Sequence, residues 1–341
     1  MEYFRQRFIE ELNEEGPVAV RVFEWPSSEV LKTMSPKDFD RHFVDWVADQ
    51  KETAKDRTKA GLEEFACLDR FNRLHAQMDR QSIIPFVGAG LSKPMGFPLW
   101  GSFLEGLTAD YPAALDQVKE HVAAYRYEEA AQCLLDRMGE DVFAEAIQST
   151  FGSRHKTLKG PVQLLPFIFT RGCITTNFDY VLDRVYEDNG QNFKAEFSGA
   201  RLKEAPRRLA DEPHCILRLH GEAESGHGRV LTQTEYTACY GQEGMYQELF
   251  RTIISNCSLL FLGCSLSADR TFQTLRDIKR SAVVETPRHY AFLPLYETTD
   301  REARRRELGE ADIHPIWYSP DDHDQAIEDL LISLLEGGFH D

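Results

Sequence analysis

The stretch IIPFVGAGLS, residues 83–92, is a short apolar run that leads into two glycines and a serine. An apolar run of this length, closed by glycine, is typical of a buried strand in a parallel sheet. Because Gly88 and Gly90 carry no side chain, a ligand can approach the backbone there, as phosphate groups do at the N-terminus of a helix. The stretch therefore predicts a strand that is followed by a ligand-binding turn.

Similar apolar runs alternate with helical patterns through the rest of the chain. The strand-like runs occupy residues 167–177, 214–221, 258–265, 289–295 and 314–319. The helical stretches occupy residues 180–188, 245–255, 269–279 and 325–337. Strands that alternate with helices predict an α/β fold, a Rossmann-like parallel sheet that is flanked by helices.

The composition and the hydrophobic pattern of the chain change near residue 81. Residues 1–80 are rich in charge and carry helical spacing, apart from a short stretch at 18–25 that reads as a strand. Residues 81–341 contain the predicted sheet, and helical periodicity returns within them at about 101–165. We therefore predict a mostly helical N-terminal segment at 1–80 and a sheet domain at 81–341 with a helical insertion.

The N-terminal segment carries an aromatic stripe. Phe39, Phe43 and Trp46 recur at the interval of three to four residues that places side chains on one face of a helix. These aromatics either pack into the core of their own chain or form an oligomer surface. We expect a homo-oligomer with part of its interface in residues 1–80.

Composition and charge limit the kinds of molecule that the chain is expected to bind. The chain has 341 residues, 42% of them hydrophobic, and a formal net charge of −17. A surface of that charge repels a polyanion, so direct binding to nucleic acid is disfavoured. The sequence lacks an apolar run of the ~20 residues that a membrane helix needs, and its N-terminus lacks the apolar core of a secretion signal.

Cysteine usage points to a reducing compartment. None of the seven cysteines lies in a Cys-x-x-Cys pair, and their number is odd. A disulfide framework or a structural zinc site is therefore not expected. We predict a cytoplasmic protein that needs no metal.

Small and polar residues gather where the predicted strands end. They are Gly88, Ala89, Gly90 and Ser92 after the first strand, Thr176, Asn177 and Asp179 after the second, His220 after the third, and Gly263, Cys264 and Ser265 after the fourth. Ligands of open parallel sheets bind at this edge, beyond the carboxyl ends of the strands. Each residue also has a purely structural interpretation, such as a tight turn for the glycines, a helix cap for Asn177 or Asp179, or a core position for His220.

Two common nucleotide-binding motifs do not fit the first turn. The dehydrogenase pattern G-x-G-x-x-G requires a glycine where this chain has Lys93. The chain also lacks the G-x-x-x-x-G-K-[ST] pattern of P-loop NTPases. The Gly-Ala-Gly turn must therefore be interpreted together with the other strand ends.

The motifs GAGLS, TTNFD, LHG and GCS, in this order, resemble those of the sirtuin superfamily. The resemblance covers about residues 82–320, and it is closest to the sirtuin-like (SIR2-like) NAD-cleaving domains of bacterial antiphage defence systems. It implies that residues 81–341 form a catalytic domain whose substrate is NAD⁺. The implied activity is that of an NAD⁺ glycohydrolase, which releases nicotinamide and ADP-ribose, in an abortive-infection system.

The resemblance also implies roles for single residues. Gly88, Ala89, Gly90 and Ser92 would line the phosphates and ribose of NAD⁺, and Gly263, Cys264 and Ser265 would contact its adenosine half. Asn177 and Asp179, which flank Phe178 just after Thr176, would lie beside the nicotinamide ribose and the carboxamide. His220 would be the catalytic base.

Two departures separate the chain from the deacetylating sirtuins that it resembles. The stretch after GAGLS reads Gly96-Phe97-Pro98-Leu99-Trp100 and lacks the Asp and Arg of their G-I-P-D-F-R stretch. Their four-cysteine zinc module is also missing, and the helical insertion at about 101–165 follows the first loop instead. Protein deacetylation is therefore the least favoured activity.

The side chains at the strand ends suit cleavage of NAD⁺ even when the family resemblance is set aside. Loss of neutral nicotinamide leaves a ribosyl cation, so the site needs polar groups around the ribose and a base for water. Asn177, Asp179 and His220 supply an amide, a carboxylate and an imidazole. A sensor that binds NAD⁺ or ADP-ribose without turnover, and a scaffold subunit, remain alternatives.

An enzyme that degrades NAD⁺ in its own cytosol must be controlled. We therefore expect an oligomer or a protein partner to regulate it. The resemblance suggests a HerA-type ATPase, an Argonaute-like protein or direct sensing of a phage protein as that partner.

Overall fold

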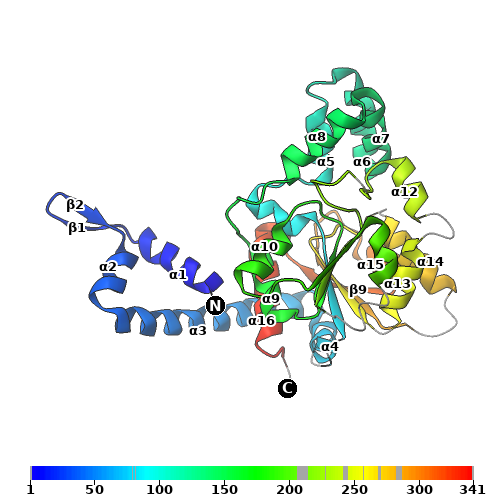
Figure 1. Ribbon diagram of the computed structural model, residues 1–341. Helices are drawn as coiled ribbons and strands as arrows, with labels where there is room; N and C mark the ends of the chain where they lie inside the picture. Colours follow the sequence, from blue (N-terminus) through cyan, green and yellow to red (C-terminus); the bar gives the residue numbers. More distant parts are fainter. Residues whose placement is uncertain are drawn as a thin grey trace.

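A seven-stranded sheet forms the centre of the protein, with strand order β5-β6-β4-β3-β7-β8-β9 and every pair parallel (Figure 1). The computed structural model describes residues 2–78, 80, 82–205, 214–226, 228–240, 245–255, 257–267, 270–281 and 286–339. The strands are β3 (Ile83–Val87), β4 (Gly172–Thr175), β5 (Ala195–Ser198), β6 (Cys215–Arg218), β7 (Ser258–Leu262), β8 (His289–Pro294) and β9 (Ile313–Tyr318). The predicted Rossmann-like parallel sheet is confirmed.

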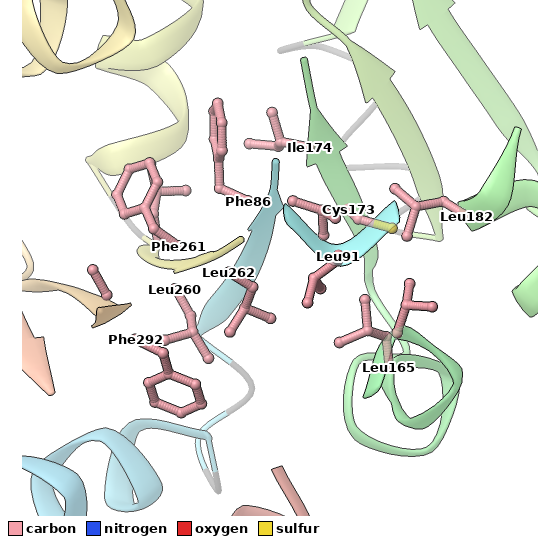
Figure 2. Packing of buried hydrophobic residues seen from close by; sticks show 14 of the residues in the cluster. Phe86, Leu91, Leu165, Cys173, Ile174, Leu182, Leu260, Phe261, Leu262 and Phe292 are labelled. Atoms are coloured by element: carbon pink, nitrogen blue, oxygen red, sulfur yellow. The ribbon is translucent and has the colours of Figure 1, made fainter. Parts of the chain in front are cut away.

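The central strands are buried because helices cover both faces of the sheet. All five residues of β3 and all five of β7 are buried. Figure 2 shows Phe86 and Phe261 on one face and Leu260 and Phe292 on the other. The rings of Phe86 and Phe261, which are partners in register, lie 4.9 Å apart. Burial of each such side chain contributes about 1.5–3 kcal/mol, which explains why uninterrupted apolar runs form these strands.

The helices that surround the sheet follow the expected alternation. They are α4 (Leu68–Met78), α9 (Leu165–Ile168), α10 (Val181–Asp188), α12 (Gln233–Tyr240), α13 (Met245–Ile254), α14 (Arg270–Ser281), α15 (Arg301–Gly309) and α16 (His323–Leu335). Short 3-10 turns are η1 (Ala89–Met95), η3 (Pro161–Leu164), η4 (Gly199–Glu204) and η5 (Pro320–Asp322). Among the helices of the described ranges, none has both the length and the apolar character that crossing a bilayer requires.

The helical insertion is a separate layer above the sheet in Figure 1. It consists of α5 (Trp100–Leu107), the turn η2 (Pro112–Ala114), α6 (Leu115–Ala123), α7 (Tyr127–Met138) and α8 (Glu140–Phe151). The rings of Trp100 and Phe178 lie 4.9 Å apart, so the insertion packs directly onto the loop that follows β4. The insertion therefore contacts the edge of the sheet at which the predicted site residues lie.

The first part of the N-terminal segment projects away from the sheet domain, and its long helix leads back to that domain (Figure 1). It contains α1 (Glu2–Glu14), a hairpin of β1 (Val18–Val20) and β2 (Phe23–Trp25), α2 (Ser27–Met34) and the long helix α3 (Pro36–Glu64). The stretch 18–25 is therefore not the single strand that the sequence suggested, because Arg21 adopts a positive φ of 60° and turns the chain. An ion pair of 2.7 Å between Arg57 and Asp329 attaches α3 to α16.

The aromatic stripe of this segment packs within its own chain. Phe39 and Phe43 are buried, and their rings lie 5.3 and 5.6 Å from the ring of Phe8 on α1. Trp46 is half-buried and donates a hydrogen bond of 3.0 Å to Glu11. Of the two interpretations of the stripe, packing within the chain is the one that these contacts support.

One expected strand is corrected, and one strand of the sheet was not predicted. The run 167–177 does not form one strand: α9 extends to Ile168, and β4 begins only at Gly172. Helix α9 carries a proline in its first turn, where a proline is compatible with a helix. Strand β5 was not predicted because Ala-Glu-Phe-Ser is short and only partly apolar, as suits its position at the edge of the sheet.

Candidate functional site

The sheet order places all four predicted strand ends side by side. Strands β6, β4, β3 and β7 are consecutive neighbours, and parallel strands have their carboxyl ends at one edge. From β3 the chain first continues to β4 on one side and later returns to β7 on the other. This reversal of direction beside β3 is the position at which open α/β sheets bind ligands.

The first loop is packed tightly against the loop that follows β7. The Gly88 amide donates to the Leu262 carbonyl, and the Gly90 amide donates to the Gly263 carbonyl, both at 2.9 Å. A Cβ atom on Gly88 or Gly90 would lie 2.6 or 2.8 Å from the Gly263 carbonyl oxygen. Neither Gly88 nor Gly90 has a positive φ, so a left-handed backbone is not the reason for glycine here. The close approach that demands glycine comes from the chain itself.

The loop after β7 carries three of the predicted residues. Gly263 has a φ of +66°, and its own Cβ would lie 2.6 Å from the Leu91 nitrogen. Cys264 is half-buried beside the carbonyl of Phe86, and Ser265 is exposed. That these residues contact adenosine stays a prediction. The start of the helix predicted at 269–279 lies outside the described residues, and α14 is described from Arg270.

Asn177 is the buried polar side chain at the centre of the site. Its amide nitrogen donates to the Ser92 hydroxyl at 3.2 Å, and its backbone nitrogen donates to the Thr175 hydroxyl at 3.0 Å. Thr175 in turn donates to the Val87 carbonyl of β3, whereas the neighbouring Thr176 is half-buried. The side-chain oxygen of Asn177 is buried and has no hydrogen-bond partner among the described residues. A buried acceptor without a partner costs free energy, so this oxygen is available for a ligand donor.

Asp179 stabilises the start of α10 and also lies beside the same hydroxyl. Its carboxylate accepts a hydrogen bond of 3.0 Å from the Val181 backbone. Asp179 thus bonds the backbone at the first residue of α10, whose N-cap position is Tyr180, whereas the Asn177 side chain bonds to Ser92 instead. Burial raises the pKa of the Asp179 carboxyl, while hydrogen bonds from Val181 and Ser92 and the charge of Arg218 oppose that rise.

Arg218 is a positioning residue that the sequence reasoning missed. It is fully buried at the end of β6, and its guanidinium donates to Glu196 at 2.6 Å and to Asp183. It also donates to the Asp179 carbonyl at 3.0 Å, which fixes the loop after β4. An arginine inside an apolar strand run was the signal that could have identified it, since a buried charge must be paired.

His220 is a buried, neutral imidazole between two tyrosines. Its Nε2 lies 3.0 Å from the Tyr240 hydroxyl and its Nδ1 lies 3.4 Å from the Tyr236 hydroxyl. Burial lowers the pKa of His220 to about 3, so the ring carries no charge at neutral pH. The two tyrosines lie on α12 and were not predicted, because their helix has no apolar stripe that marks its position.

An aromatic cluster from the insertion holds the loop between Asn177 and Asp179. Phe178 is buried, and its ring lies 6.1 Å from Phe151 of α8 in addition to its contact with Trp100. The insertion therefore supports this loop in addition to the bonds that Asn177 and Asp179 make at the strand ends. In the parts of the chain that the structure describes, no group of three or more histidine, cysteine or acidic side chains is arranged to hold a metal ion.

Comparison with known proteins supports the resemblance that the motifs indicated. Residues 171–316 match the family model of the SIR2-like domain. This segment includes TTNFD, LHG and GCS and begins after GAGLS. The match confirms the resemblance to SIR2-like domains.

The chain is also similar to a curated hydrolase. It is 21% identical over 258 residues to the NAD(+) hydrolase ThsA of Bacillus cereus (strain MSX-D12). The aligned part is 76% of this chain and 48% of that protein. The chain thus spans about half the length of the curated relative that it matches.

Proposed function

We propose that this chain is an NAD⁺ glycohydrolase, which cleaves the bond between nicotinamide and ribose with water to give nicotinamide, ADP-ribose and a proton. The observation that carries the proposal is the unpartnered, buried side-chain oxygen of Asn177 at the edge of four adjacent strands. A ribose hydroxyl or the attacking water supplies the donor that this oxygen lacks. The similarity to a SIR2-like domain and to an NAD(+) hydrolase supports the same substrate.

The geometry suits a reaction with a cationic transition state. As nicotinamide leaves, positive charge develops on the ribose, and the amide oxygen of Asn177 is an acceptor that stabilises donors beside it. The bond between Asn177 and Ser92 directs the amide nitrogen toward the protein and leaves the oxygen for the substrate. In this proposal Asp179 accepts a hydrogen bond from the nicotinamide carboxamide.

His220 completes the proposed machinery as the acceptor for a proton of water. Because burial lowers its pKa to about 3, the ring is neutral at pH 7 and need not lose a proton first. A weak base is sufficient because the water becomes acidic as its oxygen bonds to the ribosyl cation. The hydroxyls of Tyr236 and Tyr240 orient the ring.

The proposal is tested by incubating the purified protein with NAD⁺ and separating the products by chromatography. We expect nicotinamide and ADP-ribose in equal amounts from the native chain and from samples that contain EDTA. The Asn177→Ala variant should release both products at least ~10²-fold more slowly. Asn189→Ala is a matched control, because the Asn189 side chain donates to the Val185 carbonyl of α10 at 2.8 Å.

A nucleotide sensor is the second candidate. It is favoured by the two tyrosine hydroxyls that occupy both ring nitrogens of His220 in the structure. Calorimetry with NAD⁺ distinguishes the two functions. Binding of NAD⁺ by a protein that forms no nicotinamide, with or without cell extract from infected bacteria, would favour the sensor and contradict the hydrolase.

We further propose that the chain acts in the cytoplasm as the effector of an antiphage system, together with a protein partner such as a HerA-type ATPase. NAD⁺ in bacteria that express the chain and its partner should fall after phage infection. Bacteria that express Asn177→Ala should retain their NAD⁺ and release phage. Retained NAD⁺ in infected cells with the native chain would argue against an effector role.

The N-terminal segment is proposed to contact a second copy of this chain. Its projecting hairpin and the adjacent α2 expose Val22, Phe23 and Met34, with exposed fractions of 86%, 62% and 80%. A two-stranded hairpin is marginally stable alone in water, so apolar cover would stabilise it. A second copy offers the same hairpin for a two-fold interface, which is the commonest arrangement in oligomers.

A further inference from the structure

A cationic cavity of about 380 Å³ lies at the opposite edge of the sheet from the candidate site. Its lining is Ala66, Asp69, Arg70, Arg73, Arg288, Tyr290, Arg305 and His314. Tyr290 and His314 lie near the amino ends of β8 and β9, where they are partners in register, and their rings are 6.2 Å apart. Since all strands of the sheet are parallel, these amino ends are remote from Asn177 and His220.

Four arginines from three parts of the fold converge on this cavity. Arg70 and Arg73 lie one turn apart on α4, Arg288 precedes β8, and Arg305 lies on α15. The last three are exposed, so their guanidinium groups reach the cavity from its rim. Such a concentration of positive charge is unexpected in a chain with a net charge of −17.

The lining of the cavity carries more positive than negative charge. In the described residues, none of Arg73, Arg288 and Arg305 forms an ion pair, and Asp69 is the only acidic residue of the lining. Burial lowers the pKa of Arg70, and the charges of Arg305, Arg301 and Arg73 lower it further. Arg70 already donates to the Pro315 carbonyl, which fixes one cation at the floor.

We propose that this cavity binds a small molecule that carries a chain of at least two phosphate groups. Guanidinium groups bind phosphate oxygens with two parallel hydrogen bonds, and four positive charges exceed the charge of about −2 that one phosphate group carries. The volume lies within the range of small-molecule sites. Most residues of the lining are charged, and Ala66 and the ring of Tyr290 are its apolar members, so we expect charge to dominate recognition.

The inference does not depend on NAD⁺ cleavage, because the two sites are at opposite edges of the sheet. The probes are pyrophosphate and ATP, which share the phosphate chain and differ in the nucleoside. Equal affinities for the two would show that the phosphates alone are recognised. A higher affinity for ATP would place the nucleoside in contact with the lining as well.

The experiment is calorimetric titration of the full chain with each probe at constant ionic strength. We expect saturable binding that weakens as salt is raised, and a loss of affinity of at least ~10-fold in the double variant Arg73→Gln/Arg288→Gln. Both side chains are exposed, so the variant should keep its fold, which circular dichroism verifies. Arg306→Gln is the matched control: it removes the neighbouring charge on α15, which does not line the cavity.

Three results would overturn the proposal. One is the absence of saturable binding of either probe to the native chain at millimolar concentration. Another is an equal loss of affinity in Arg306→Gln and in the double variant, which would indicate general attraction to the surface. The last is loss of pyrophosphate binding in Asn177→Ala, which would place the phosphates in the candidate NAD⁺ site.

Discussion

The amide nitrogen of Asn177 donates a hydrogen bond of 3.2 Å to the Ser92 hydroxyl, which lies 85 positions earlier in the chain. This bond joins the loop after β3 to the loop after β4. It also determines the direction of the amide, since the nitrogen faces Ser92 and the oxygen remains without a partner. The arrangement makes Asn177 a ligand-binding side chain and Ser92 the residue that orients it.

Replacement of Asn177 separates catalysis from helix capping. The backbone at the start of α10 bonds to Asp179 rather than to Asn177, so Asn177→Ala should lower the free energy of unfolding by only about 1 kcal/mol. Turnover of NAD⁺ should fall by ~10²-fold or more, because a preorganised polar group at the reacting centre is removed. Melting temperature and product release are measured together. A large thermal loss with an unchanged specific activity would show that Asn177 has only a structural role.

Replacement of His220 tests the proposed base. His220→Ala should lower NAD⁺ cleavage by at least ~10²-fold, the lower end of general-base contributions. His289→Ala is the matched control. His289 is also buried, but it lies at the amino end of β8 and accepts its hydrogen bond from the Leu259 backbone. The control should lose stability and keep its turnover per folded molecule. A folded His220→Ala protein with the native rate would exclude the assignment.

Adding a side chain to a glycine of the first loop should reduce both stability and ligand binding. Gly90→Val places carbon atoms within 2.8 Å of the Gly263 backbone, so we expect reduced stability together with loss of detectable NAD⁺ binding. Gly61→Ala on α3 is the control, because a Cβ there meets nothing within 4 Å and alanine favours a helix by roughly 0.5–1 kcal/mol. Denaturant titration and calorimetry decide the outcome. Native affinity in a Gly90→Val protein would show that ligands do not depend on the shape of this loop.

Two buried histidines should make the fold sensitive to mild acid. Burial lowers the pKa of His220 to about 3 and that of His289 to about 4, from 6.5. As the pH falls below 6.5, the unfolded chain takes up protons that the folded chain does not, so the free energy of unfolding falls. Each histidine contributes a slope of up to about 1.4 kcal/mol per pH unit between its two pKa values.

The variant His289→Gln removes the contribution of His289 to this pH dependence. The glutamine oxygen can still accept a hydrogen bond from the Leu259 backbone. Denaturation at pH 7, 6 and 5 should show a shallower loss of stability for the variant than for the native chain. Parallel curves for the two proteins would mean that His289 is not held neutral in the folded state.

Charge substitutions test the proposed contact between two copies. Phe23 is 62% exposed on the hairpin, so Phe23→Glu should dissociate an assembly and leave the far-ultraviolet circular dichroism unchanged. Phe43 is buried against Phe8, so Phe43→Glu should reduce the helical signal instead. Light scattering measures the mass of each protein. A native chain that is monomeric, or a Phe23→Glu protein of unchanged assembly mass, would remove the hairpin from the interface.

Local patterns identified most of the sheet and most of the candidate site. The runs of β3, β6, β7, β8 and β9 were recognised because burial on both faces favours a nearly continuous series of apolar residues. The polar residues after them were recognised because they interrupt such runs. Strand β5 was not predicted because a short edge strand lacks that pattern. The start of β4 was placed too early because the helical turn before it, which contains a proline, is also apolar.

The sequence by itself determined that the chain forms a parallel α/β sheet and that Asn177, Asp179 and His220 follow its strands. Only the tertiary structure decided which polar groups meet, because the order β6-β4-β3-β7 depends on contacts between segments that are far apart in the chain. That order pairs Asn177 with Ser92, and the packing of α12 places Tyr236 and Tyr240 against His220. It likewise assembles the arginine cavity from α4, α15 and the start of β8, whose charges are scattered along the sequence and converge only when the sheet forms.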